Sequence, residues 1–197
     1  RSGTAAEEDE EAIGHADIAT RNNYIGRAVL NIPVAGNAAL RLSGSYSQAP
    51  ENHYNRFDDT DLRIRGKSVR GRFLWEPISD ISFNLIADYS KFSQKGGTPW
   101  TVYHSTPGSR LTTRLAGCGV TVSEDNQEGC IDGGNYQTNQ SYGFSGQADF
   151  TLGRHTLTAI SAYRAFESKA YASDVDSVPI NRLNVNESPT KIRNFSQ

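Results

Sequence analysis

The sequence predicts an all-β fold, and within that class an antiparallel, up-and-down transmembrane β-barrel segment with about seven strands. One observation is that apolar and polar residues alternate along stretches of roughly ten residues, because side chains of a strand point to its two faces in turn. The other is that short connections between these stretches alternate with long ones. Transmembrane barrels combine both features, with short turns at one end and long loops at the other.

The elements follow from this rhythm. The acidic run from Glu7 to Glu11 predicts a polar acidic loop, or a lead-in to the barrel, over residues 1–21, and residues 22–197 are expected to form an incomplete barrel domain. A connection longer than about 15 residues is uncommon in compact soluble domains, which favours the barrel. The predicted strands cover residues 22–32, 38–48, 64–75, 81–92, 140–150 and 155–166, and a seventh begins near residue 191. The predicted short turns are residues 33–37, 76–80 and 152–154, and the long loops are residues 49–62, 93–139 and 169–190.

Six charged residues in these strands fall on the polar face. In residues 39–48, for example, Leu40 and Leu42 share one face while Arg41 and Ser43 share the other. A Lys or Arg on the lipid face costs about 2–4 kcal/mol at the bilayer midplane, so such charges are expected to face the lumen. There they would bind a plug or line a solute path, or be solvated and ion-paired without a further role. The residues concerned are Arg41, Arg70, Arg72, Asp88, Asp149 and Arg164.

Aromatic residues near the predicted strand ends indicate the girdles of a membrane-water boundary. The alternative is that aromatic residues are simply frequent in strands. The set consists of Tyr46, Trp75, Tyr89, Phe92, Tyr142, Phe150, Tyr163 and Phe166.

Composition excludes several other classes. No run approaches the roughly 18 apolar residues that a membrane helix needs. The formal net charge is only −2 and no basic cluster is evident, so no nucleic-acid partner is expected. No nucleophile-base-acid arrangement, phosphate loop or nucleotide fingerprint occurs, so neither enzyme activity nor a cofactor is expected. The chain contains no methionine and ends inside a predicted strand, and we interpret it as an internal part of a longer protein.

Four segments resemble the early and middle barrel of TonB-dependent outer-membrane receptors. The hairpin G-R-A-V-L-N-I-P-V-A-G-N-A-A-L-R-L-S-G-S-Y-S (residues 26–47) is similar to the family's pattern of "G…N.P…ALR.S". The next hairpin, S-V-R-G-R-F-L-W-E-P-I-S-D-I-S-F-N-L-I-A-D-Y-S (residues 68–90), resembles the family's "RG…W.P..D", which marks a strand, a periplasmic turn and a strand. The segments H-T-L-T-A-I-S-A-Y-R-A-F (residues 155–166) and R-N-F-S-Q (residues 193–197) resemble "L.SISAYR" and the start of "FSQELRL".

The resemblance implies a 22-stranded barrel in the outer membrane of a Gram-negative bacterium, in contact with outer-membrane lipid. It also implies a plug that couples import of a scarce nutrient to the TonB–ExbB–ExbD system, although neither the plug nor the TonB-binding segment is in this chain. The expected small-molecule ligand is an iron-siderophore complex, with oligosaccharide, haem or cobalamin as alternatives. A passive porin and a soluble, secreted β-sandwich binding module are the competing classes of protein.

The longest loop contains the remaining candidate residues. Cys118 and Cys130 are the only cysteines, and because outer-membrane loops are in an oxidising compartment we expect a disulfide rather than a metal pair. Trp100, Tyr103 and His104 would stack on a ligand, or only pack the loop together. The crowded acids Asp58, Asp59 and Asp61, together with Asp174 and Asp176, lack the glycine-bearing pattern of a calcium loop, so no metal site is expected.

Overall fold

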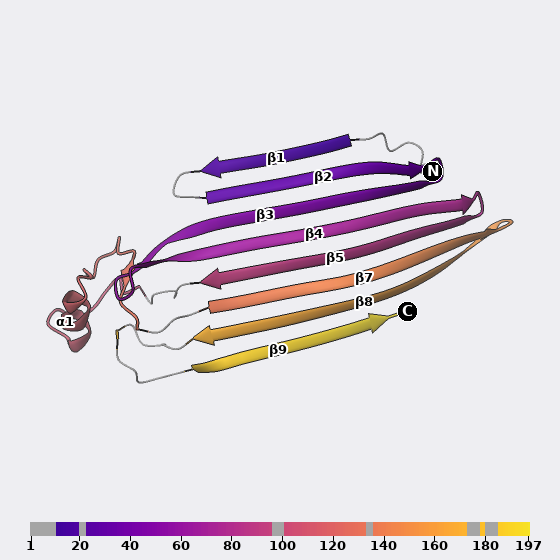
Figure 1. Cartoon of the computed structure of the whole chain (residues 1–197). Helices are drawn as coiled ribbons and strands as arrows, with labels where there is room; N and C mark the ends of the chain where they lie inside the picture. Colours follow the sequence, from indigo (N-terminus) through magenta and orange to yellow (C-terminus); the bar gives the residue numbers. More distant parts are fainter. Residues whose placement is uncertain (1–10, 20–22, 96–100, 133–135, 173–177, 180–184) are drawn as a thin grey trace.

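A computed structural model describes residues 11–19, 23–95, 101–132, 136–172, 178–179 and 185–197. Within them the chain forms one sheet in which each long strand pairs antiparallel with the next long strand along the chain, in the order β1-β2-β3-β4-β5-β7-β8-β9 (Figure 1), while the two-residue β6 pairs in parallel with the end of β3. The predicted all-β, up-and-down arrangement is therefore confirmed. The described part of the sheet is open, with β1 and β9 as its edges.

The strands are β1 (Glu11–Ala19), β2 (Asn23–Ala35), β3 (Ala38–Asn55), β4 (Thr60–Ile78), β5 (Ile81–Lys95), β6 (Glu128–Gly129), β7 (Tyr136–Leu152), β8 (His155–Ala172) and β9 (Val185–Ser196). A single helix in the described residues, α1 (Arg110–Gly117), lies in the connection between β5 and β7.

The loop predicted over residues 1–21 is wrong for residues 11–19, which form strand β1. This strand pairs with β2 along its whole length, from Glu11 opposite Asn31 to Ala19 opposite Asn23. The acidic run predicted a solvated loop, whereas the ladder with β2 is made by backbone N–H and C=O groups and does not depend on the side chains. The sheet thus has one more long strand than the sequence predicted.

Most strands also extend further than predicted at the loop end. β3 and β4 reach Asn55 and Thr60, so the connection predicted over residues 49–62 shrinks to residues 56–59. β7 begins at Tyr136 and β8 continues to Ala172. The apolar-polar alternation stops near residues 48 and 166, but ladder hydrogen bonds between backbones do not require it.

The predicted short turns all lie at one end of the sheet (Figure 1). They are pairs of residues, 36–37, 79–80 and 153–154, and Gly153 has a φ of +65°. Positive φ at the first of two central residues is the feature of a type II′ turn, where glycine carries no steric cost. The longer connections and α1 lie at the opposite end. The predicted asymmetry of turns and loops is therefore present.

One face of the sheet, here called the apolar face, carries apolar side chains over successive cross-strand rows. On β5 the rows run through Ile81, Phe83, Leu85, Ala87 and Tyr89. One row beyond Tyr89 the same face becomes charged. The residues in register there are Lys67, Lys91, Gln140, Glu167 and Lys191.

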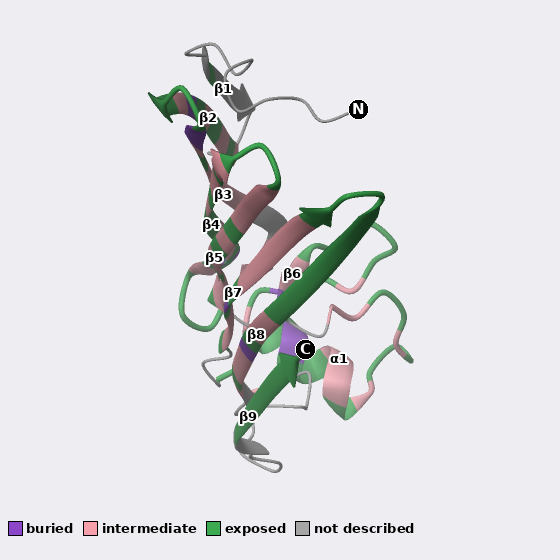
Figure 2. Ribbon diagram, turned by 90° about the vertical axis from the view of Figure 1, so that its right-hand side faces the viewer, coloured by how far each residue is buried: buried purple, intermediate pink, exposed green. Residues whose placement is uncertain are grey.

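No second layer covers the apolar face in the described part of the chain. Phe144 and Leu157 keep 60% and 58% of their surface exposed, and exposed residues follow β8 and β9 in Figure 2. The buried apolar cluster lies instead among the loops, where Leu115, Val120 and Cys130 pack together with Val178. Among the described residues, no helix is both long and apolar enough to cross a membrane.

Candidate functional site on the polar face

The opposite face of the sheet, here called the polar face, brings five of the six predicted charged residues into two adjacent rows. Arg41 lies opposite Arg72, and one row further toward the loop end Arg70 lies opposite Asp88. Arg164 belongs to the same row as Asp88, two strands away. These rows place four guanidinium groups around one carboxylate, so the centre of the polar face carries an excess of positive charge.

Arg164 on β8 forms an ion pair with Asp88 on β5 across the intervening strand β7. Its Nη2 atom lies 2.9 Å from Oδ2 of Asp88, and its Nη1 atom donates to the Ser141 hydroxyl at 3.3 Å. Gly143 occupies the position between the two charged residues in the row. A Cβ atom there would lie 2.8 Å from the carbonyl oxygen of Tyr163 and 3.5 Å from Cζ of Arg164. Glycine is thus required for this close approach.

The other arginines of the polar face are held differently. Arg72 donates from Nε to Oδ1 of Asn84 at 2.9 Å, which orients its guanidinium along the sheet. Arg41 and Arg70 form no ion pair with the described side chains, and both are exposed. No described side chain therefore neutralises their charge.

Asp149 is separate from these rows and lies nearer the turn end. It accepts hydrogen bonds from Thr158 at 2.6 Å and from Gln147 at 2.8 Å. Its lone pairs are thus occupied by neighbours in the sheet, and it does not belong to the arginine group.

A hollow adjoins the arginine rows on the loop side, with a cavity volume of about 270 Å³. Serine hydroxyls dominate its polar-face lining, and the rings of Phe92 and Phe166 flank it. By register these two rings lie on the polar face, whereas Tyr89 and Tyr142 of the same predicted aromatic set lie on the apolar face. The polar-face lining consists of Ser45, Ser47, Gly66, Ser68, Ser90, Phe92, Asn139, Ser141 and Phe166.

A compact cap lies at the loop end, in the connection between β5 and β7. Cys118 and Cys130 form a disulfide with their Cα atoms 6.3 Å apart. Helix α1 begins after Ser109, whose hydroxyl accepts a hydrogen bond from the Thr112 backbone N–H, as expected of an N-cap. Asn126 is buried and joins two parts of the cap, because its amide donates to the carbonyls of Val102 and Glu128. The cap is therefore an ordered unit.

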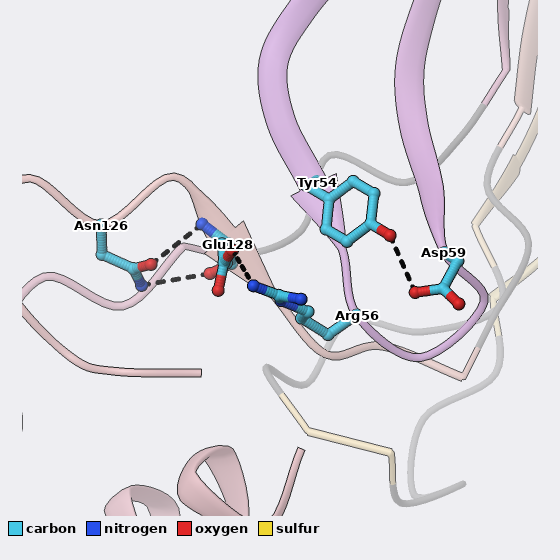
Figure 3. A network of polar contacts seen from close by, with 5 residues as sticks. All are labelled: Tyr54, Arg56, Asp59, Asn126 and Glu128. Atoms are coloured by element: carbon cyan, nitrogen blue, oxygen red, sulfur yellow. Dashed lines mark hydrogen bonds and ion pairs between the residues drawn. The ribbon is translucent and has the colours of Figure 1, made fainter. Parts of the chain in front are cut away.

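The cap is fastened to the β3–β4 hairpin. Asn55, buried at the end of β3, donates to the Ile131 carbonyl at 2.9 Å and accepts from the Ile131 N–H at 3.0 Å. Arg56 donates to Glu128 at 2.6 Å, and its guanidinium carbon lies 5.3 Å from the centre of the Tyr54 ring (Figure 3). The hydrogen bond to Glu128 raises the pKa of Arg56.

The predicted acidic group at the hairpin tip serves the turn itself. Tyr54 donates to Asp59 at 2.8 Å (Figure 3), and Thr60 donates to Asp58 at 2.6 Å. The hydrogen bond to Asp59 raises the pKa of Tyr54, because ionisation of the phenol would remove the donor. Asp59 also has a φ of +54°, a conformation that aspartate tolerates better than most residues.

Of the three loop residues predicted to contact a ligand, Trp100 lies outside the described residues. Tyr103 and His104 are exposed on the cap. Sequence reasoning missed the residues that fasten the cap, Asn55, Arg56 and Glu128, since their partners lie more than seventy positions apart. The serine face of the hollow could have been predicted, because serine recurs at every second position over residues 43–47.

Comparison with known proteins gives no match: no family model, no curated protein and no solved structure is significantly similar to this chain. The candidate site therefore rests on its own geometry.

Proposed function

We propose that this chain is part of an outer-membrane β-barrel of the TonB-dependent transporter type, and that its polar face lines a path for an anionic ferric chelate. In this arrangement the apolar face meets lipid, the short turns face the periplasm and the cap faces the outside. The barrel is closed by strands beyond the edges β1 and β9, to a total of 22 strands.

The height of the apolar face carries the membrane part of the proposal. The apolar rows extend from Ile81 to Tyr89, and a strand rises about 3.4 Å per residue, so they cover about 27 Å along the strand. With a strand tilt of about 40°, this corresponds to about 21 Å along the membrane normal, comparable to the roughly 25 Å apolar band of outer-membrane barrels.

The exposure of these rows supports the same conclusion. Large apolar side chains, such as Leu85 at 49% and Phe144 at 60%, have no described layer above them. A soluble β-sandwich needs a second sheet on this face, whereas the described strands form a single sheet. An apolar surface this continuous requires a partner that is itself apolar.

The charge of the polar face favours an anionic solute. Arg41 and Arg70 are exposed and form no described ion pair, while Arg72 and Arg164 are oriented by Asn84 and Asp88. Guanidinium groups pair with carboxylate and other oxyanions through fixed forks of donors, and ferric chelates with an excess of such oxygen ligands are anions. Import would use the TonB–ExbB–ExbD system through a plug domain.

A neutral oligosaccharide is the second candidate, favoured by the hollow beside the arginine rows. The serine hydroxyls of the hollow offer hydrogen bonds, and the rings of Phe92 and Phe166 offer apolar faces, which are the two kinds of contact that a sugar ring uses. The two candidates differ in their dependence on Arg70, which a neutral sugar does not need.

Ligand binding to the full-length protein in outer-membrane vesicles tests the solute class. Arg41→Gln together with Arg70→Gln is expected to weaken binding of an anionic ferric chelate at least tenfold, with a reduced salt dependence. Arg154→Gln, in the exposed turn at the other end of the sheet, is the control for loss of positive charge. Unchanged chelate affinity, combined with binding of oligosaccharide, would replace the first candidate by the second.

A further inference from the structure

We propose that a row of serine hydroxyls on the polar face binds a sugar ring, and that this ring belongs to the same solute whose anionic group meets the arginines. The row, called here the serine row, consists of Ser45, Ser68, Ser90 and Ser141. The inference rests on the proposed function and deepens it, because it makes the solute a sugar-bearing anion instead of a plain anion or a neutral sugar.

The register places the four serines side by side on four adjacent strands. Ser68 on β4 lies opposite Ser45 on β3 and opposite Ser90 on β5, and Ser90 in turn lies opposite Ser141 on β7. Adjacent strands are about 4.8 Å apart, so the four serines form a line about 14 Å long. The spacing is comparable to the length of one sugar residue in an extended chain. Each hydroxyl donates and accepts hydrogen bonds, as the hydroxyls of a sugar do.

The hollow that contains the serine row has an uncharged lining on the polar face. The two lysines that border it, Lys67 and Lys91, lie by register on the apolar face. Its floor includes Gly66, where a Cβ atom would lie 2.8 Å from Oγ of Ser47, so a larger residue would displace that hydroxyl. An uncharged hollow lined by hydroxyls suits the neutral, hydroxyl-rich part of a solute.

Two aromatic rings border the serine row. Phe92 follows Ser90 by two residues on the same face of β5, and Phe166 on β8 lies directly opposite Ser141. Both residues are partly exposed. The carbon-bound hydrogens of a sugar ring are attracted to the negative face of an aromatic ring, while the sugar hydroxyls are left to the serines. The serine row therefore offers the two kinds of contact that a sugar needs.

The arginine rows begin directly beside the serine row. Arg70 follows Ser68 by two residues on β4, which is about 7 Å toward the turn end. Arg164 joins the two rows, because its Nη1 atom donates to Ser141 at 3.3 Å while its Nη2 atom lies 2.9 Å from Asp88. A solute that occupies both rows thus has its anionic group about one sugar residue away from its sugar ring.

Two sources supply this chemistry. One is a ferric chelate to which a sugar is attached, and the other is an oligosaccharide of uronic acids, in which each ring carries a carboxylate. Both join a sugar ring to an oxyanion, which guanidinium groups bind through paired donors. Binding with and without iron distinguishes them.

The test measures equilibrium binding of four probes to the full-length protein in detergent. Two probes are a ferric catecholate with and without attached glucose, and the other two are a β-1,4-linked glucuronate trimer and its neutral counterpart cellotriose. Ser68→Ala together with Ser90→Ala removes two hydroxyls of the serine row. At about fivefold for each lost hydrogen bond, this variant is expected to bind a sugar-bearing anion about twenty-fivefold more weakly, and the sugar-free chelate as tightly as the wild type.

The matched control is Thr151→Val together with Thr156→Val. It removes two exposed hydroxyls from a pair at the turn end of the same face and is expected to match the wild type with every probe. Circular dichroism checks that both variants are folded.

The inference would be overturned if the wild type bound both chelates equally and the glucuronate trimer no better than cellotriose. An unchanged affinity of the serine variant for the sugar-bearing anion would overturn it too, as would an equal loss for the sugar-free chelate. Iron-free binding of the glucuronate trimer, with neither chelate bound, would support the sugar-bearing anion but overturn the ferric chelate of the proposed function. Binding of the sugar-free chelate alone would leave the proposed function and overturn this inference, and binding of none of the four probes would overturn both.

Discussion

The guanidinium of Arg164 on β8 lies 2.9 Å from the carboxylate of Asp88 on β5, although β7 separates the two strands. Gly143 makes this possible because the guanidinium passes over a position without a side chain. The ion pair ties three strands together at the centre of the polar face, and Arg70, which lies opposite Asp88, forms no ion pair with the side chains that the structure describes.

Replacing Gly143 by alanine should separate this ion pair and destabilise the sheet. The new Cβ atom would lie 2.8 Å from a backbone carbonyl oxygen, so the strands must shift, at an expected cost of about 1–3 kcal/mol in the free energy of unfolding. Denaturant unfolding of the protein refolded into detergent measures it. Gly26→Ala on β2 is the matched control, because nothing lies within 4 Å of its added Cβ. Equal stability of both variants would contradict the close approach.

The disulfide should stabilise the cap without affecting the sheet. It closes a loop with a sequence separation of 12, which corresponds to about 3 kcal/mol in the chain-entropy model. Cys118→Ser together with Cys130→Ser should therefore increase hydrogen exchange in α1 and accelerate tryptic cleavage after Arg114. Exchange in β4 and β5 serves as the internal control. Unchanged protection of α1 would mean that the cap is held by other contacts alone.

Tyr54 should titrate above its ordinary pKa of about 10, because its phenol donates to Asp59. For a group whose folded pKa is raised, the stabilising contribution is fully present below the unfolded pKa and is lost as pH rises through the folded pKa. The contact should thus persist past pH 10 and fail only at the higher pKa of Tyr54. Tyrosinate absorbance of the wild type minus that of Tyr54→Phe gives this titration.

The matched variant for this titration is Asp59→Asn, which removes the negative charge beside the phenol. It should bring the pKa of Tyr54 back toward its ordinary value. Because asparagine can still accept the hydrogen bond, a Tyr54 titration that does not respond to Asp59→Asn would show that the charge of Asp59 does not contribute to the raised pKa.

The cap should depend on the hairpin through Arg56 and Glu128. Glu128→Gln removes the charge of an exposed pair, for which about 0.2–1 kcal/mol is typical. Asn55→Ala, in contrast, leaves the buried N–H and C=O of Ile131 without partners and should cost about 1–3 kcal/mol. Proteolysis of the cap should therefore be faster in Asn55→Ala than in Glu128→Gln. Equal rates in the two variants would contradict the greater contribution of the buried contact between Asn55 and Ile131.

The sequence predicted the parts of the fold that depend on period-two alternation and on turn residues. The alternation predicted which residues lie on each face of β3, β4 and β5, and the turn residues predicted the turns at residues 79–80 and 153–154. It did not predict β1, because pairing with β2 depends on backbone groups and not on a side-chain pattern. Nor did it predict the loop-side extensions of β3 and β7, where alternation ends but the ladder continues.

The candidate site was predictable only in part for the same reason. Alternation places Arg70, Asp88 and Arg164 on one face, but only the register between strands shows that they share a row. The role of Gly143 depends on that register too. The contact between Asn55 and Ile131 joins residues 76 positions apart and has no local signature.

The central claim, that the apolar face meets hydrocarbon and the polar face meets water, is tested most directly at two consecutive residues of β7. Phe144 lies on the apolar face at 60% exposure and Ser145 on the polar face. In lipid vesicles, Phe144→Arg is expected to lower the free energy of unfolding of the inserted protein by about 2–4 kcal/mol, and Ser145→Arg by less than about 1 kcal/mol. Equal effects of the two substitutions, or a stable Phe144→Arg protein in the membrane, would contradict the account.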